Sequence, residues 1–178
     1  MVKQFFKGTK PLPAKFDYAR KVLESLKEMP GTKHCELKLG LTENLEPCGF
    51  FDKDIWFRTI VDLLIIDETT GVAYVVDYKT GKSATYADVG QLELMSLAVF
   101  KHYPQVKKIK AGLLFVVCNA FIKETYPLTS ESDLWAKWLG EYGKLQKAYE
   151  VGVWNPQPSG LCRQWCVVLS CAHNGRSE

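Results

Sequence analysis

Apolar residues recur every three or four positions in three stretches of the chain, and this spacing predicts a helix with one buried face in each stretch. The three stretches are residues 14–28, 87–102 and 131–150. Pro30-Gly31 ends the first predicted helix and Pro104 ends the second, because neither proline nor glycine continues a helix well.

Runs of Val, Ile and Leu predict the strands. The two strongest runs, residues 57–66 and 72–79, are apolar at successive positions, as strands buried on both faces are. Glu68-Thr69-Thr70-Gly71 joins them as a hairpin turn. Residues 33–39 and 109–118 predict two further strands. The resulting order, α-β-β-β-α-β-α, predicts an α/β sandwich around a short mixed sheet.

Composition narrows the class of protein but does not reveal its function. The 178 residues are 47% hydrophobic and 24% charged, which fits a globular domain with a small appendage and excludes a disordered chain. No run of about eighteen apolar residues occurs, so we expect no membrane partner. Residues 1–7 lack the apolar core of a signal peptide, so we expect a cytoplasmic protein, in the host cytoplasm if it is viral. The net charge of +3 permits a nucleic-acid partner without arguing for one.

Two carboxylates and one ammonium group converge if the hairpin has the simplest register. With Ile66 paired to Ala73 across the turn, Asp62 lies opposite Asp77. Lys79 leaves the same face as Asp77, because alternate residues of a strand share a face. A β-bulge would shift this pairing by one residue.

These charges interrupt apolar strands, so they need partners. Two adjacent carboxylates repel each other, and Lys79 neutralises at most one of them. A divalent cation held by Asp62 and Asp77 would balance the rest, and carboxylate oxygens suit Mg²⁺ or Mn²⁺. The alternative is a structural ion pair of Lys79 with one aspartate, while the other aspartate reaches solvent. The second aspartate in hairpin register favours the metal site.

The same residues resemble a nuclease family. The segment Asp77-Tyr78-Lys79-Thr80-Gly81-Lys82, with Asp62 before it and Gln91 on the next predicted helix, is similar to the PD-(D/E)xK nuclease superfamily. The RecB-like exonuclease branch, which includes CRISPR-associated and phage exonucleases, is the closer likeness. It covers about residues 14–118 and extends weakly to the C-terminal cysteines. It implies a three-layer restriction-endonuclease-like core (α-β-β-β-α-β), followed here by a C-terminal helix and a Cys-rich tail.

The resemblance also implies roles for individual residues. It makes Asp62, Asp77 and the Tyr78 carbonyl metal ligands. Lys79 would orient or activate the attacking water and stabilise the charge that develops on the phosphate. Gln91 would hold the nucleic-acid backbone or the face of the active site.

Three residues nearer the N-terminus are further metal candidates. Glu36 lies where relatives often have an acidic residue and could reach a second cation, or it could be an exposed strand carboxylate. His34 shares the strand face of Glu36. RecB-like enzymes use a metal-binding histidine before the aspartate, usually from a helix, so a plain surface histidine is the favoured interpretation of His34. Glu24 in the first helix could replace that histidine, although a solvated face is favoured there.

Three of the six cysteines are close together near the C-terminus: Cys162, Cys166 and Cys171. Several RecB-like exonucleases end in three close cysteines that bind a [4Fe–4S] cluster with a fourth cysteine far upstream, which Cys35 or Cys48 would supply here. His173 offers a different solution, a local Cys3His zinc site. Packed reduced thiols are the third interpretation. We therefore expect a nuclease domain at residues 1–154 and a possible metal-binding tail at residues 155–178.

Basic and aromatic residues give weaker signs of nucleic-acid binding. Lys82 and Gln91 follow the motif, and a lysine group flanks Pro104 and could contact phosphates, although a solvated loop is favoured for that group. The group is Lys101, Lys107, Lys108 and Lys110. Aromatic residues at helical spacing could stack bases but more often belong to a core. They are Trp135, Trp138 and Tyr142.

The leading hypothesis is a metal-dependent deoxyribonuclease that hydrolyses phosphodiester bonds of DNA ends or single strands with a metal-activated water. Exonuclease action and a phage origin follow from the resemblance alone. The alternative is a nuclease fold that binds nucleic acid without hydrolysis, because Met95 stands where the branch usually has tyrosine. A third hypothesis is a redox- or iron-sensing protein. Related phage exonucleases form rings, so the resemblance also allows a homo-oligomer.

Overall fold

The computed structural model describes residues 2–175, apart from the side chains of Val2 and Lys15. Its elements are α1 (Val2–Phe6), η1 (Ala14–Ala19), α2 (Arg20–Glu28), β1 (Thr32–Thr42), β2 (Pro47–Cys48), β3 (Ile55–Asp67), β4 (Val72–Lys79), α3 (Gly90–His102), β5 (Lys108–Phe115), β6 (Ala120–Pro127), η2 (Leu128–Ser130), α4 (Glu131–Val151) and α5 (Leu161–Gln164). The chain divides into two compact units at residues 136/137, and each is described by itself. The functional boundary expected at residue 154 stays a prediction.

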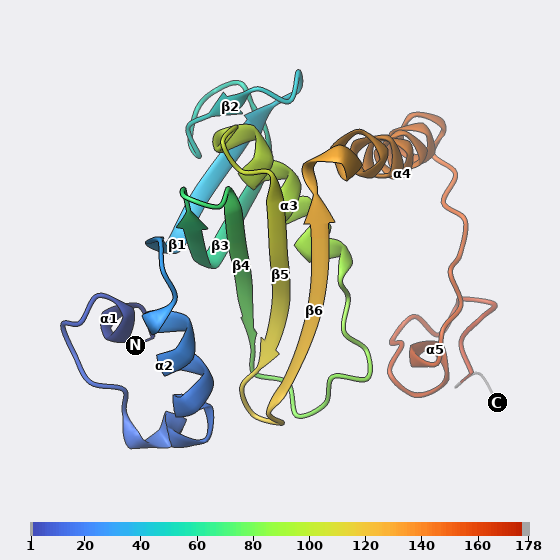
Figure 1. The fold of residues 1–178 in the computed structure, drawn as a ribbon. Helices are drawn as coiled ribbons and strands as arrows, with labels where there is room; N and C mark the ends of the chain where they lie inside the picture. Colours follow the sequence, from blue (N-terminus) through green and yellow to red (C-terminus); the bar gives the residue numbers. More distant parts are fainter. Residues whose placement is uncertain (1, 176–178) are drawn as a thin grey trace. The chain divides into compact units, whose positions relative to one another are not determined.

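Within the described residues, the strands form one six-stranded sheet in the order β2-β1-β3-β4-β5-β6 (Figure 1). β4 and β5 are parallel, and the other neighbouring pairs are antiparallel. A parallel pair needs a long crossover, and α3 lies in the connection between β4 and β5. The predicted mixed α/β architecture, consistent with a restriction-endonuclease-like core, is therefore confirmed.

Both faces of the central strands are buried, which explains their continuous apolar runs. On one face, side chains of α1, η1 and α2 pack against Leu63, Ile65 and Val76. The alternate residues Leu64 and Val75 are fully buried as well. They leave the opposite face of their strands, and α3 contacts these strands.

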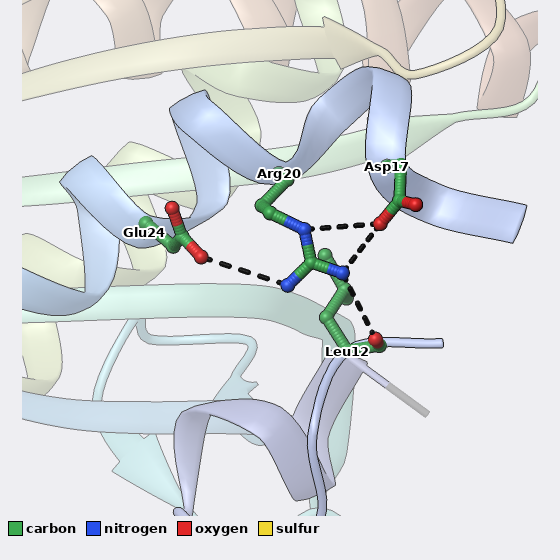
Figure 2. Close-up of polar contacts among 4 residues, drawn as sticks. All are labelled: Leu12, Asp17, Arg20 and Glu24. Carbon is green, nitrogen blue, oxygen red and sulfur yellow. Dashed lines mark hydrogen bonds and ion pairs between the residues drawn. The ribbon is translucent and has the colours of Figure 1, made fainter. Parts of the chain in front are cut away.

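Arg20 joins the N-terminal segment to α2 (Figure 2). Its guanidinium donates to the Leu12 carbonyl at 3.2 Å and, from Nε, to Asp17 Oδ1 at 3.0 Å. Glu24 Oε1 lies 3.6 Å from Arg20 Nη1. Glu24 is exposed, which agrees with the solvated helix face favoured for it in the sequence analysis. Its carboxylate pairs with Arg20 on the surface of α2.

Five elements were not predicted: α1, β2, β6 and the two short helices η2 and α5. β6 pairs with β5 along its whole length, but Lys123 and Glu124 interrupt its alternation of apolar and polar residues. β5 ends at Phe115 and not at Cys118, because the chain turns there and Asn119 takes a left-handed conformation with φ 51°.

The β3–β4 hairpin has the predicted register. Ile66 pairs with Ala73, and the ladder continues to Leu63 opposite Val76. Gly71 closes the turn with φ 66° and donates its N–H to the Asp67 carbonyl at 2.9 Å. The four-residue turn therefore fixes which residues of the two strands face each other.

We expect Gly31→Ala to destabilise the fold by about 1–3 kcal/mol, the cost of a strained backbone conformation. Gly31 has φ 112°, and a methyl group there would collide with the backbone carbonyl of Ile66. Gly140→Ala is the matched control, because among the described residues no atom beyond its chain neighbours and its own helix backbone lies within 4 Å of the position of its Cβ; it should be neutral or add about 0.5–1 kcal/mol to helix stability. Urea denaturation measures both. Equal stability of the two variants would contradict this explanation of the α2–β1 turn.

Candidate active site

The β3–β4 ladder stops one residue before the two predicted aspartates. Leu63 opposite Val76 is its last pair, so Asp62 and Asp77 occupy the next positions. The pairing does not continue there, because Asp62 Oδ2 accepts the backbone N–H of Tyr78 at 2.9 Å. A side-chain carboxylate thus replaces a strand carbonyl as the acceptor and holds the end of β4 against β3.

Lys79 lies between an aspartate and a glutamine. Its Nζ is 2.7 Å from Asp77 Oδ2 and donates to Gln91 Oε1 at 2.7 Å. Gln91 is fixed in turn, because its Nε2 donates to the Asp88 carbonyl at 2.9 Å. The Asp88 side chain accepts the N–H of Gly90 at 2.8 Å at the start of α3. The sequence analysis did not single out Asp88, although an acidic residue just before a helix is a recognisable N-terminal signal.

Asp77 is buried, at 8% exposure. Its Oδ2 accepts no hydrogen bond of normal geometry from the described residues. The contact with Lys79 is therefore an ion pair without a well-directed hydrogen bond. A buried carboxylate oxygen in this state is rare in stable structures, and it is an available ligand atom for a cation.

Burial raises the pKa of the Asp62 carboxyl above its ordinary value. The hydrogen bond from Tyr78 opposes this rise, the charge of Asp77 adds to it, and Lys79 opposes it again. Glu36 also raises the pKa of Asp62. Burial, with a smaller contribution from the neighbouring carboxylates, therefore disfavours the ionised form of Asp62, and a bound cation would favour it.

Glu36 is in β1, at the position opposite Asp62 of β3. The neighbouring pairs are Cys35 with Leu63 and Leu37 with Val61, and Glu36 between them has φ 54°. Its exposed carboxylate forms an ion pair with Lys3 of α1 at 2.6 Å, and this hydrogen-bonded lysine lowers the pKa of Glu36.

His34 is half-buried, and its ring centroid lies 6.1 Å from that of Tyr103. The structure does not bring its imidazole into a metal-binding group: residues 2–175 contain no cluster of three or more His, Cys, Asp and Glu side chains that could hold a metal ion. Its predicted metal role stays a prediction.

A model of the PD-(D/E)XK nuclease superfamily matches residues 11–171. The chain belongs to this superfamily. No curated protein matches it. The solved structure titled "Crystal structure of SSO0001" is similar over 89% of this chain and 69% of its own, with 15% sequence identity and a TM-score of 0.42.

PD-(D/E)XK nucleases typically use divalent metals, and the residues at the end of the β3–β4 ladder fit such an ion. Asp62 and Asp77 supply two carboxylates, one of them with a buried oxygen that lacks a hydrogen bond. A magnesium ion takes one or two carboxylates and keeps several waters, so it does not need a larger protein cluster. The Tyr78 carbonyl as a third ligand stays a prediction.

The C-terminal cysteines give no support to an iron–sulfur or zinc site in this member of the superfamily. Cys162, His173 and Arg163 line a hollow of about 430 Å³, and the Cys162 sulfur accepts the N–H of Ser159 at 3.4 Å. Cys166 and Cys171 do not join Cys162 and His173 in a metal-binding group among the residues that the structure describes.

The predicted phosphate-binding lysines lie in different parts of the nuclease unit. Lys108 pairs with Val72 at the start of β4, about 17 Å of strand from Asp77, and Lys107 precedes it. Lys82 is exposed in the segment that follows β4. Lys82 is therefore the lysine of this set nearest the aspartates along the chain.

Two other predicted contacts belong to the structure of the protein. Lys101 forms an ion pair with Glu131 at 3.0 Å, and Trp135 is buried at 6% exposure.

Across the described part of the chain, no helix has both the length and the apolar character to cross a bilayer.

We expect Asp62→Asn to raise the melting temperature of the metal-free protein at pH 7. A carboxyl with a raised pKa stabilises the fold below its unfolded pKa and loses that contribution as the pH rises through its folded pKa. Asparagine removes the charge and keeps an acceptor for Tyr78. The difference should shrink at about pH 4, where aspartates protonate.

Asp67→Asn is the matched control on the same strand, and its effect should have the opposite sign. Hydrogen bonds from Thr69 and Thr70 lower the pKa of Asp67, so its contribution is present at neutral pH and is lost as the pH falls through its folded pKa. Thermal unfolding in EDTA, followed by circular dichroism, measures both variants. A lower melting temperature for Asp62→Asn than for wild type at pH 7 would contradict the electrostatics described here.

Proposed function

We propose that the chain is a metal-dependent nuclease that hydrolyses DNA, of the RecB-like exonuclease type. The observation that carries the proposal is the arrangement where the β3–β4 ladder ends. A buried aspartate oxygen without a hydrogen bond and a lysine lie at the end of this ladder, next to a second aspartate. Superfamily members are generally nucleases, which supports the same reaction.

Asp62 and Asp77 would hold a Mg²⁺ or Mn²⁺ ion, which would supply a bound water of lowered pKa and polarise the phosphoryl oxygen. Lys79 would orient the attacking water and stabilise negative charge on the phosphate. Gln91 keeps the Lys79 ammonium in position through the 2.7 Å hydrogen bond, and Asp88 fixes Gln91.

DNA as the substrate, the exonuclease mode and the RecB-like branch are supported by the motif. The segment from Asp77 to Lys82 and the placement of Gln91 at the start of the next helix are the features that resemble that branch.

Binding without hydrolysis is the second candidate. Glu36, the residue that could reach a second cation, is engaged by Lys3. Met95, where the branch usually has tyrosine, is buried in α3 at 8% exposure. This candidate predicts nucleic-acid binding with no cleavage product in Mg²⁺ or Mn²⁺.

We expect wild-type protein to cleave end-labelled DNA in Mn²⁺ and to lose the activity in EDTA. Asp77→Asn and Lys79→Ala should each reduce the rate by about 10²–10⁴-fold, because each removes a group that acts on the reacting atoms. Asp67→Asn is the control, since its carboxylate serves only the hairpin turn. Full activity in EDTA, or in Asp77→Asn, would contradict the mechanism. Internal cuts in circular DNA would contradict the exonuclease mode.

Metal binding should also be visible without activity. At a free Mn²⁺ concentration 100 times its Kd, the fold should gain about 2.7 kcal/mol, which corresponds to several degrees in melting temperature for a chain of this size. The gain should disappear in Asp77→Asn and persist in Asp67→Asn. Differential scanning calorimetry with and without Mn²⁺ measures it, and an equal gain in Asp77→Asn would mean that the ion binds elsewhere.

A further inference from the structure

Two aromatic rings and two cations form a cluster outside the catalytic residues. Phe50 and Phe51, in the segment after β2, make an edge-to-face pair with ring centroids 5.0 Å apart. Lys38 of β1 lies over both rings, with Nζ 5.3 Å from the Phe50 centroid and 5.0 Å from the Phe51 centroid. Arg58 of β3 lies over the same rings at 5.5 and 6.0 Å. We call these four residues the cation–aromatic platform.

The platform is open to solvent. Phe51 is 74% exposed, so most of its ring surface is open to solvent although Phe50 packs against it. Lys38 and Arg58 are also exposed.

The positive charges of the platform are not neutralised by ion pairs. Neither Lys38 nor Arg58 has a carboxylate partner within ion-pair distance among the described residues. Asp52 and Asp54 lie in the same loop, and the Asp52 carboxylate accepts the N–H of Gly49 at 2.6 Å. The two cations therefore rest on aromatic faces and stay available to an anion.

The platform shares a strand with the candidate active site. Arg58 and Ile60 are exposed, and the intervening side of the strand is buried at Val61. Because alternate residues of a strand share a face, Asp62 lies on the same face of β3 as Arg58 and Ile60. Asp62 lies four positions after Arg58 along the strand, which is about 13 Å. Lys38 pairs with Ile60 on the neighbouring strand. A short stretch of nucleic acid spans this distance.

The combination of an open ring and unpaired cations fits one kind of ligand. Every nucleobase has a flat face that stacks on an aromatic ring, and adjacent phosphates are attracted to the cations. In a duplex these faces are covered by neighbouring base pairs, so only a single strand can use both features. An acidic peptide would satisfy the cations but has no general use for the exposed face of Phe51.

We propose that the cation–aromatic platform binds single-stranded nucleic acid, with a base stacked on Phe51 and phosphates near Lys38 and Arg58. The proposal rests on the proposed nuclease function in taking the bound strand to be the substrate. It adds that the chain selects single strands and holds them beside the carboxylates.

The test is the binding of fluorescein-labelled oligothymidylate in EDTA, followed by fluorescence anisotropy. Phe51→Leu should weaken binding about fivefold or more while leaving duplex binding unchanged. Lys38→Gln/Arg58→Gln should weaken binding and make the slope of log K against log salt shallower by about 1.4, which is about 0.7 for each lost phosphate contact. Both should melt like wild type, because the altered side chains are exposed.

Lys21→Gln/Lys27→Gln is the matched control. This double variant removes two positive charges from α2, as many as the platform variant removes. One of them, Lys27, also lies over an aromatic ring, 4.5 Å from the centroid of Phe5. The control should bind the oligonucleotide like wild type. Equal losses in this control, or loss only in Lys107→Gln/Lys108→Gln, would overturn the proposal. Displacement of the oligonucleotide by polyglutamate at equal charge concentration would also overturn the proposal, because it would show that the platform recognises negative charge alone.

Binding in EDTA reports on the platform, and cleavage in Mn²⁺ reports on the carboxylates. Platform-dependent binding without cleavage would contradict the nuclease function alone. Cleavage with unchanged binding in Phe51→Leu would contradict the platform alone.

Discussion

The hydrogen bond from the Tyr78 backbone to the Asp62 carboxylate is the interaction on which the candidate site depends. An antiparallel ladder normally pairs backbone with backbone, and here a side chain takes over at the point where the ladder ends. The exchange satisfies the N–H of Tyr78 and fixes the Asp62 carboxylate where the charge of Asp77 raises its pKa. It also costs stability, because it holds a negative charge in a half-buried position beside a second one.

The surrounding structure offsets part of this cost. Lys79 lies close to Asp77 and donates to Gln91, and α3 presents Gln91 because Asp88 fixes its first turn. The compensation is incomplete, since Asp77 Oδ2 still lacks a hydrogen bond. Incomplete satisfaction of a buried polar group inside an otherwise well-packed sheet is expected at functional sites. It is consistent with a cation as the missing partner.

The hairpin was predictable from sequence because two continuous apolar runs and a turn ending in glycine fix both the strands and their register. The pairing of Asp62 with the Tyr78 amide was not, because the same pattern equally allows the ladder to continue. The ion pair of Glu36 joins residues 33 positions apart, and the left-handed backbone of Glu36 leaves no trace in a strand pattern. The position of Lys107 and Lys108 follows from the parallel pairing of β4 with β5, which local spacing does not reveal.

The most direct test of the central claim is an anomalous difference map from crystals of the protein grown with Mn²⁺. A peak in contact with the carboxylates of both Asp62 and Asp77, with Lys79 still bonded to Gln91, is the predicted result. Strong manganese peaks elsewhere, with Asp77 still paired only with Lys79, would contradict the assignment of this strand end as the metal centre.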